Sequence, residues 1–261
     1  MDDRLTLLSP AKLNLFFRVL KRRPDGYHEI SSLYQAIDLC DTLTLSLAEK
    51  ETFSCNVFID SSNLVLRVAD LFREKTGIDQ PFSFKLEKKI PLEAGLGGGS
   101  SNAATALWGL NQLMQTGIDE ETLTKWAAEL GADVAFFFSH GRAYCEGIGE
   151  ILTPLPPVEA KPLWIAKPKA GLSTKAVFQA LNLESLDSHA LNDLENVAFK
   201  LVPPLKQLKA DLFGLGFERV QMTGSGTAFF CFGSIKQPQL VDTTFFPARF
   251  LYRNERSWYK I

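Results

Sequence analysis

Apolar residues occupy every second position in three segments of the first half of the chain. Residues 42–48 give the clearest case, with Leu43, Leu45 and Leu47 separated by threonine and serine. Side chains of a strand point alternately to its two faces, so this alternation is typical of a half-buried strand. The pattern predicts strands over residues 5–8, 42–48 and 82–88.

Apolar residues recur every three or four positions in three other segments, which predicts amphipathic helices over residues 65–72, 103–114 and 119–130. Asn63 stands where it could cap the first helix, and Asp119 stands at the start of the third. Gly131 follows the third helix and is predicted to end it in a left-handed conformation. The first half of the chain is therefore a mixture of helices and strands.

Prolines at positions 154, 156 and 157 interrupt the chain, because they lack a backbone donor and restrict their neighbours to extended conformations. We place a domain boundary there, which gives domains over residues 1–153 and 154–261. The second half has a strand-like pattern at 162–167, 220–222, 228–232 and 249–252, and a helix-like pattern at 173–183, 190–201 and 204–213. The expected fold class is α+β with two lobes.

Composition and charge narrow the possible functions. The chain has 261 residues, of which 46% are hydrophobic and 22% charged, so it can bury a proper core. Its net charge of −2 does not favour a nucleic acid as partner. The four cysteines lie far apart, which argues against a metal clip. The start of the chain lacks a signal-peptide pattern, and the most apolar window, 134–138, is too short to cross a membrane. We therefore expect a cytoplasmic location and no membrane partner.

The segment 91–104 joins a predicted strand to a predicted helix and contains four glycines. Glycines allow backbone N–H groups to approach a phosphate, and the start of a helix adds unpaired donors. Ser100 or Ser101 could cap that helix and face a phosphate. The spacing differs from a Walker loop, which needs a lysine after its last glycine, and from the dinucleotide fingerprint, which needs glycine where Ser100 stands. A plain flexible connector is the alternative.

This segment resembles the ATP-binding motif of the GHMP kinase superfamily, which includes galactokinase, homoserine kinase, mevalonate kinase and phosphomevalonate kinase. Residues 10–15 and 222–228 resemble the first and third motifs of that superfamily, in the expected order. Within it, the blocks 23–29, 97–102, 130–134 and 146–150 are most similar to the family of 4-diphosphocytidyl-2-C-methyl-D-erythritol kinases. The resemblance covers nearly the whole chain. It implies a two-lobed GHMP kinase fold, with an N-terminal lobe similar to a ribosomal-protein domain and a smaller α/β-sandwich C-terminal lobe.

The resemblance also implies roles for the catalytic and nucleotide-binding residues. Asp133 would be the base that takes the proton of the acceptor hydroxyl, and Lys12 its electrostatic partner. From composition alone, Asp133 reads as a helix cap and Lys12 as a solvated lysine. ATP would be the phosphoryl donor and Mg²⁺ its companion, with Ser101 as a possible metal ligand. The expected ATP-binding residues are Pro91, Leu92, Glu93, Ala94, Gly95, Leu96, Gly97, Gly98, Gly99, Ser100 and Ser101.

For the acceptor, the resemblance implies that Tyr27 and Phe178 stack on a cytosine ring while His28 binds its polar edge. Each could equally be an ordinary surface or core residue. The further expected acceptor-binding residues are Asn14, Gly224, Ser225 and Gly226. Lys175 stands where many relatives have proline, and the family-like pair Asn192 and Asp193 receives no chemical step.

The function expected from this resemblance is ATP-dependent phosphorylation of the 2-hydroxyl of 4-diphosphocytidyl-2-C-methyl-D-erythritol, in the non-mevalonate isoprenoid pathway. The partner would then be a small molecule that carries a cytidine diphosphate group, and the protein would be a monomer or a weak homodimer. Two alternatives stay open: a kinase of the same fold for another small alcohol, and a catalytically silent module that binds a nucleotide or RNA. The near-neutral charge argues against RNA.

Overall fold

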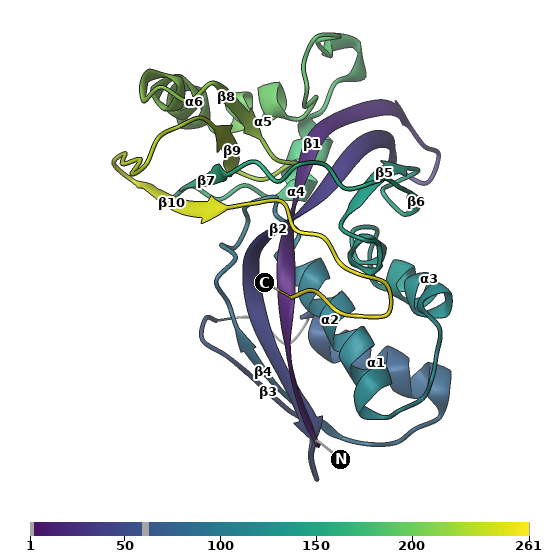
Figure 1. Cartoon of the computed structure of the whole chain (residues 1–261). Helices are drawn as coiled ribbons and strands as arrows, with labels where there is room; N and C mark the ends of the chain where they lie inside the picture. Colours follow the sequence, from purple (N-terminus) through teal and green to yellow (C-terminus); the bar gives the residue numbers. More distant parts are fainter. Residues whose placement is uncertain (1–2, 59–62, 261) are drawn as a thin grey trace.

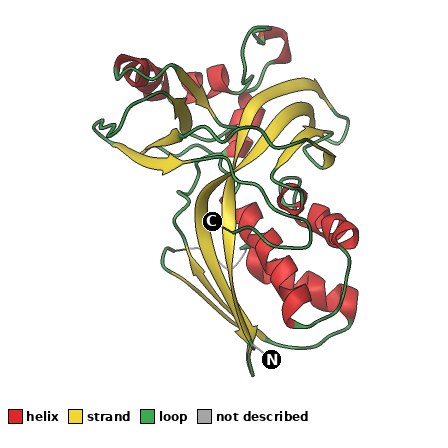
Figure 2. Ribbon diagram, viewed as in Figure 1, coloured by secondary structure: helices red, strands yellow, loops and turns green. Residues whose placement is uncertain are grey.

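The computed structural model describes residues 3–58 and 63–260 and contains helices and two β-sheets (Figures 1 and 2). The strands are β1 (Arg4–Arg22), β2 (His28–Leu47), β3 (Thr52–Cys55), β4 (Phe82–Glu87), β5 (Arg142–Glu146), β6 (Ile151–Pro154), β7 (Leu163–Pro168), β8 (Arg219–Met222), β9 (Phe229–Phe232) and β10 (Thr243–Ala248). The helices are α1 (Leu64–Thr76), α2 (Gly98–Leu113), α3 (Glu120–Leu130), α4 (Thr174–Ala180), α5 (Glu195–Leu201) and α6 (Pro204–Gly214), with short 3₁₀ helices at Ala135–Phe138 and Leu183–Ser185.

Two long antiparallel strands form the centre of the first sheet. β1 pairs with β2 from Arg4↔Ser46 to Arg22↔His28, and three irregularities interrupt the register. The other edge of β2 pairs with β4 and β5, which gives the strand order β3-β4-β2-β5-β6. Helices α1, α2 and α3 lie together against one face of this sheet (Figure 1). The predicted strands 5–8 and 42–48 are therefore parts of much longer strands.

The helices of the first lobe begin largely where their capping residues predict. The Oδ1 atom of Asn63 accepts a hydrogen bond from Leu66 N at 3.2 Å, and Asp119 does the same for Thr122 N at 2.7 Å. Both predicted caps are confirmed. The prediction for Gly131 is wrong, because its φ of 165° is extended rather than left-handed.

Helix α2 begins at Gly98, five residues before the first residue of the predicted helix. Its N-cap is Gly97, which has no side chain to accept a hydrogen bond, so Ser100 and Ser101 lie inside the first turn and do not cap it. The expected serine cap is therefore wrong. The first turn keeps its backbone N–H groups available for another acceptor.

The second lobe has a four-stranded antiparallel sheet with the order β10-β7-β9-β8, and helices α4, α5 and α6 pack with it. The strands predicted near 162–167, 220–222 and 228–232 are present as β7, β8 and β9. A strand at 249–252 is wrong, because the last strand lies at Thr243–Ala248, and Phe250 makes only an isolated bridge with Ile37. Helix α5 begins at Glu195 rather than at 190.

The hydrophobic cores do not follow the sequence division at residues 153 and 154. Phe17, Val19 and Ile30, from the long strands, lie in the same buried cluster as the helices of the second lobe. Another cluster joins Leu13 and Ile37 of the long strands to β7 and β9. Both sheets are thus connected by β1 and β2, which run through the whole molecule (Figure 1).

The tail after β10 returns to the first lobe (Figure 1). Trp258 and Tyr259 are 3% and 2% exposed and belong to the core that α1, α2 and α3 share. The Trp258 indole donates to the carbonyl oxygen of Leu8 at 2.8 Å, and the Tyr259 hydroxyl donates to that of Ser139 at 3.2 Å. Buried Arg253 pairs with Glu120 through two hydrogen bonds of 3.0 and 2.7 Å. The tail is part of the first lobe's structure.

Two smaller expectations concern cysteines and membrane segments. All four cysteines are free thiols in the structure, and three of them are buried. Within residues 3–58 and 63–260, no helix is both long enough and apolar enough to span a membrane.

Candidate functional site

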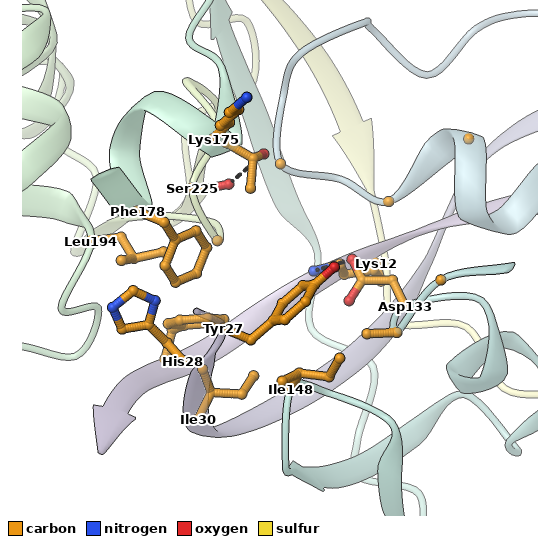
Figure 3. A pocket seen from close by; sticks show the side chains of 18 of the residues that line it. Lys12, Tyr27, His28, Ile30, Asp133, Ile148, Lys175, Phe178, Leu194 and Ser225 are labelled. Atoms are coloured by element: carbon orange, nitrogen blue, oxygen red, sulfur yellow. Dashed lines mark hydrogen bonds and ion pairs between the residues drawn. The ribbon is translucent and has the colours of Figure 1, made fainter. Parts of the chain in front are cut away.

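A cleft of about 1370 Å³ lies where the glycine-rich segment, the long strands and helix α4 meet. A pocket for one drug-sized ligand usually measures about 300–1,000 Å³, so this cleft has room for two ligands. Its walls include Lys12 of β1, Asp133 of the loop after α3, Phe178 of α4 and most of the glycine-rich segment. Figure 3 presents these side chains converging from separate elements.

The glycine-rich segment lines one part of the cleft with residues Pro91, Leu92, Glu93, Ala94, Gly95, Leu96, Gly97, Gly98 and Gly99. Gly95 and Gly97 have left-handed φ values of 74° and 67°, and Glu93 also has a positive φ of 52°. The segment leads directly into the N-terminus of α2, where backbone donors and the helix dipole favour an anion. Ser100 and Ser101 do not line the cleft, and Ser101 is fully buried.

The second glycine-rich motif packs directly against the first. A methyl group on Gly226 would lie 2.0 Å from the backbone nitrogen of Gly95, and one on Gly95 would lie 2.2 Å from the carbonyl oxygen of Thr223. Only glycine allows such an approach between two backbones. Gly224 and Ser225 line the cleft, whereas Gly226 lies behind it and supports the first motif. Contact between Gly226 and a ligand is therefore not supported.

A buried carboxylate that the sequence analysis missed holds the entry to the glycine-rich segment. Asp41 is fully buried and accepts hydrogen bonds from the backbone of Lys89 and Ile90 at 2.7 and 2.8 Å. It also accepts one from Asn102 at 2.9 Å and forms an ion pair with Lys88. A buried charge needs this many partners. Lys88 lines the cleft, but its ammonium group is committed to Asp41.

Asp133 and Lys12 lie side by side in the cleft, with Lys12 Nζ 3.3 Å from Asp133 Oδ2. The Lys12 side chain is only 5% exposed and the Asp133 side chain 31% exposed. Lys12 is therefore not a solvated surface lysine. Asp133 caps no helix either, because the 3₁₀ helix that follows begins after Val134 and has no side-chain cap. A buried cation beside a half-buried carboxylate is suited to acid–base work on a hydroxyl.

Asn14 does not contact the cleft, contrary to the expectation that it binds the acceptor. It is fully buried, and its Oδ1 accepts a hydrogen bond from Lys12 Nζ at 2.8 Å. Its amide nitrogen donates to Ser32 Oγ at 2.9 Å, and Ser32 donates to the carbonyl oxygen of Phe16 at 2.6 Å. Both ends of the amide are thus occupied. Asn14 orients the ammonium group of Lys12.

Aromatic residues line the other end of the cleft. His28 and Phe178 stack with ring centroids 5.3 Å apart and planes 28° apart, and Tyr27 is 61% exposed (Figure 3). Burial, and secondly the charge of Arg22, lower the pKa of His28 below its usual 6.5, so its imidazole is neutral at pH 7. All three residues line the cleft, and Phe178 stacks on His28 in this structure.

Polar groups connect this aromatic end to the second glycine-rich motif. The hydroxyls of Thr174 and Ser225 are 2.8 Å apart, and both residues line the cleft together with Lys175. Asn192 donates to the carbonyl oxygens of Met222 and Gly224 at 2.9 and 2.8 Å. Asp193 accepts from Val19 N at 2.8 Å. Asn192 and Asp193 therefore join the motif to β1, and neither lines the cleft.

The described residues offer little to a metal ion. They include no group of three or more His, Cys, Asp or Glu side chains that could hold one. The Ser101 hydroxyl is buried without a hydrogen-bond partner, yet Ser101 does not line the cleft. The residues therefore do not fit a metal site built by the protein, and Ser101 as a metal ligand has no support.

The cleft combines a glycine-rich loop, a lysine–aspartate pair and a second glycine-rich motif, and the chain that builds it is similar to GHMP kinases. The family model of the N-terminal domain of GHMP kinases matches residues 63–141. A homoserine kinase from Cytophaga hutchinsonii shares the fold, with a TM-score of 0.69 at 20% identity over 88% of this chain and 85% of that one.

More similar proteins narrow the class to one family. The 4-diphosphocytidyl-2-C-methyl-D-erythritol kinase of Protochlamydia amoebophila is 45% identical over 98% of this chain and 93% of its own length. The chloroplastic enzyme of that name from Oryza sativa is 40% identical over 98% of this chain and 73% of its own length. A crystal structure of a 4-(cytidine 5'-diphospho)-2C-methyl-D-erythritol kinase has a TM-score of 0.80 at 33% identity and covers 94% of this chain and 99% of that one. The chain belongs to the family of 4-diphosphocytidyl-2-C-methyl-D-erythritol kinases.

Proposed function

We propose that this kinase transfers the γ-phosphoryl group of ATP to the 2-hydroxyl of 4-diphosphocytidyl-2-C-methyl-D-erythritol, giving the 2-phosphate and ADP in the non-mevalonate isoprenoid pathway. The observation that carries this proposal is the position of Asp133 and Lys12, in one cleft with an anion-binding loop and an aromatic cluster. ATP bound at the glycine-rich loop and a cytosine bound among the aromatic residues would bring the γ-phosphate and the acceptor hydroxyl together at this pair.

The proposed chemistry needs one proton transfer and one phosphoryl transfer. The acceptor hydroxyl gives its proton to the carboxylate of Asp133 while its oxygen forms a bond to the γ-phosphorus of ATP. The bond from that phosphorus to the bridging oxygen breaks, and ADP leaves with the electron pair. Lys12, with its ammonium 3.3 Å from Asp133, orients the carboxylate before the step and offsets negative charge at the transferred group.

On the donor side, we propose that residues 91–99 and the N-terminus of α2 bind the phosphates of ATP. Support comes from the left-handed glycines and from the backbone donors that no side chain caps. ATP would enter as its magnesium complex, with the metal held mainly by phosphate oxygens and water, because the described residues offer no acidic cluster.

On the acceptor side, we propose that Tyr27 and Phe178 enclose the cytosine and that neutral His28 binds its edge. Tyr27 is exposed to the cleft and has no aromatic partner among the described residues, so a flat ring would gain a stacking surface there. Gly224 and Ser225 lie between this aromatic cluster and the glycine-rich loop and would face the diphosphate.

We also propose several properties of the protein as a whole. Its N-terminal lobe would be similar to a ribosomal-protein domain and its second lobe would be an α/β-sandwich. It would be cytoplasmic and would act as a monomer or weak homodimer without nucleic acid or membrane. The net charge of −2 supports the absence of a nucleic acid.

The test is ADP release from purified protein with ATP and magnesium, in separate assays with 4-diphosphocytidyl-2-C-methyl-D-erythritol, homoserine, galactose and mevalonate. Release that depends on the cytidyl compound alone would support both the reaction and the acceptor. ADP release with another alcohol would mean that the protein is a kinase with a different acceptor. If no acceptor elicits ADP while ATP still binds, the proposed reaction is wrong.

A further inference from the structure

Tyr34 contacts both members of the lysine–aspartate pair and has no role in the proposed mechanism. It lies in β2, is 2% exposed, and faces Asn14 of β1 across the sheet. Its hydroxyl donates a hydrogen bond to Asp133 Oδ1 at 2.9 Å. The same ring lies under the ammonium of Lys12, whose Nζ is 4.4 Å from the ring centroid. One side chain therefore contacts both members of the pair.

The two carboxylate oxygens of Asp133 have different partners. Oδ1 accepts from the Tyr34 hydroxyl at 2.9 Å, and Oδ2 lies 3.3 Å from Lys12 Nζ. A carboxylate held at both oxygens cannot rotate about its Cβ–Cγ bond without losing a charge-assisted hydrogen bond. The orientation of the remaining lone pairs toward the cleft is thereby fixed.

Tyr34 is itself held in place by close packing. Its ring meets the edge of Phe136 at 5.3 Å with an angle of 80°. On the other side, a methyl group on Gly149 would lie only 3.0 Å from the Tyr34 hydroxyl, so glycine at this position leaves room for the oxygen. A rigid donor costs little entropy when it orients a catalytic group.

We propose that Tyr34 is a positioning residue of the phosphoryl transfer, which holds the Asp133 carboxylate in the orientation that receives the acceptor proton. This inference rests on the proposed function, because it assigns Tyr34 a role only through Asp133.

The ionisation behaviour of Tyr34 agrees with a permanent donor. Burial, and secondly the charge of Asp133, raise the pKa of Tyr34 well above its usual 10, so the hydroxyl keeps its proton at every pH used for an assay. The titratable groups that face it are Lys12 from β1, Asp133 from the loop after α3 and Cys145 from β5. Burial also raises the pKa of the Cys145 thiol, which therefore stays neutral.

The decisive variant is Tyr34→Phe, which removes one oxygen and keeps the ring that packs on Phe136 and Lys12. We expect kcat to fall by roughly 10–100-fold, as for loss of a hydrogen bond to a charged group, while the KM values for ATP and acceptor stay within about twofold. The fall in kcat at nearly unchanged KM separates positioning from a structural role, because a disturbed cleft would also weaken the binding of ATP and acceptor.

Tyr144→Phe is the matched control, because it also removes a tyrosine hydroxyl that bonds a side chain, Ser31 Oγ at 2.8 Å, in the same sheet. A double-mutant cycle with Asp133→Asn gives an independent measurement, since Tyr34→Phe should have little further effect once the carboxylate is gone. Wild-type kcat in Tyr34→Phe, or full additivity in the cycle, would overturn the inference alone. Absence of ADP release from the wild type would overturn the proposed function and this inference with it.

Discussion

Asp133 presents a carboxylate to the cleft between a buried lysine and a buried tyrosine. Replacement by asparagine keeps the shape of the side chain but removes the group that would take the acceptor proton. We expect kcat to fall by about 10²–10⁴-fold, with the affinity for ATP changed by no more than about twofold. ADP release and equilibrium ATP binding measure the two effects. Glu121→Gln, at an exposed carboxylate of α3, is the control; wild-type turnover in Asp133→Asn would remove Asp133 from the mechanism.

If neutral His28 binds the acceptor as proposed, acceptor binding should depend on pH in a defined direction. Its pKa lies below 6.5 in the folded protein, so the neutral imidazole is present at pH 7 and above and a cation forms only on acidification. The KM for the acceptor should therefore be constant from pH 7 to 8 and rise as the pH falls below 6. In His28→Asn, whose amide does not titrate, the rise should disappear. An equal rise in both proteins would assign the effect to another group.

Single residues could be predicted only where a motif or a resemblance marks them. Lys12 and Asp133 stand in recognisable blocks, and the structure brings them within 3.3 Å. Tyr34 and Asp41 stand in no such block. Each sits in the middle of β2, where a tyrosine or an aspartate is unremarkable until the fold brings Asp133 or the backbone of Lys89 to it. Such contacts depend on residues far apart in the sequence, which local patterns cannot register.

The contact between the two glycine-rich motifs predicts a severe effect of one added methyl group. In Gly226→Ala the new carbon would meet backbone atoms of Gly95 and Ala94 at 2.0–2.5 Å, and a backbone cannot move aside as a flexible side chain can. We expect a loss of about 1–3 kcal/mol or more in the free energy of unfolding, together with weaker ATP binding. Urea denaturation measures the former. Gly214→Ala, where the added methyl group meets open space, should have the free energy of unfolding of the wild type. Equal stability of the two variants would contradict the close contact between the two glycine-rich motifs.

Helix α4 has a lysine near its N-terminus, where the helix dipole favours negative charge. Lys175 lies in its first turn, which has no acidic residue, and it lines the cleft beside Ser225. A diphosphate bound there would offset this unfavourable placement. Lys175→Ala should therefore raise the acceptor KM by about two- to fivefold, an effect that shrinks at high salt. Lys206→Ala, at an exposed lysine of α6, should leave KM unchanged; an unaltered KM in Lys175→Ala would exclude the contact.

Elements with one apolar face were predictable, and elements with polar residues in the core were not. Helices α1 and α3 have clear stripes and capping side chains, so their starts followed from the sequence, although α1 continues beyond the predicted residue 72 to Thr76. β1 and β2 bury Lys12, Asn14, Gln35 and Asp41, and these buried polar residues break the alternation on which a strand prediction depends. Bulges in β1 interrupt the period further. The alternation of apolar and polar residues therefore predicted only the start of β1 and the end of β2.

At the scale of the whole molecule, the long strands and the tail predict a single unfolding transition. Phe17 and Val19 of β1 lie in the core of the second lobe, while Trp258 of the tail lies in the core of the first. Trp258→Ala should lower the free energy of unfolding by about 3–5 kcal/mol and still give one transition, seen alike by circular dichroism and by ATP binding. Phe213→Ala, at a half-exposed residue of α6, is the control. Two separate transitions would show that the lobes are independent.

The return of the tail also affects the order in which the protein can form during synthesis. Domains generally fold as units while the chain emerges from the ribosome, beginning with the N-terminal one. Here the core around α1, α2 and α3 lacks Trp258 and Tyr259 until the entire second sheet has been translated. The nascent first lobe would therefore expose an unfilled apolar surface while the second lobe is synthesised, and the tail would fill it in the last step of folding.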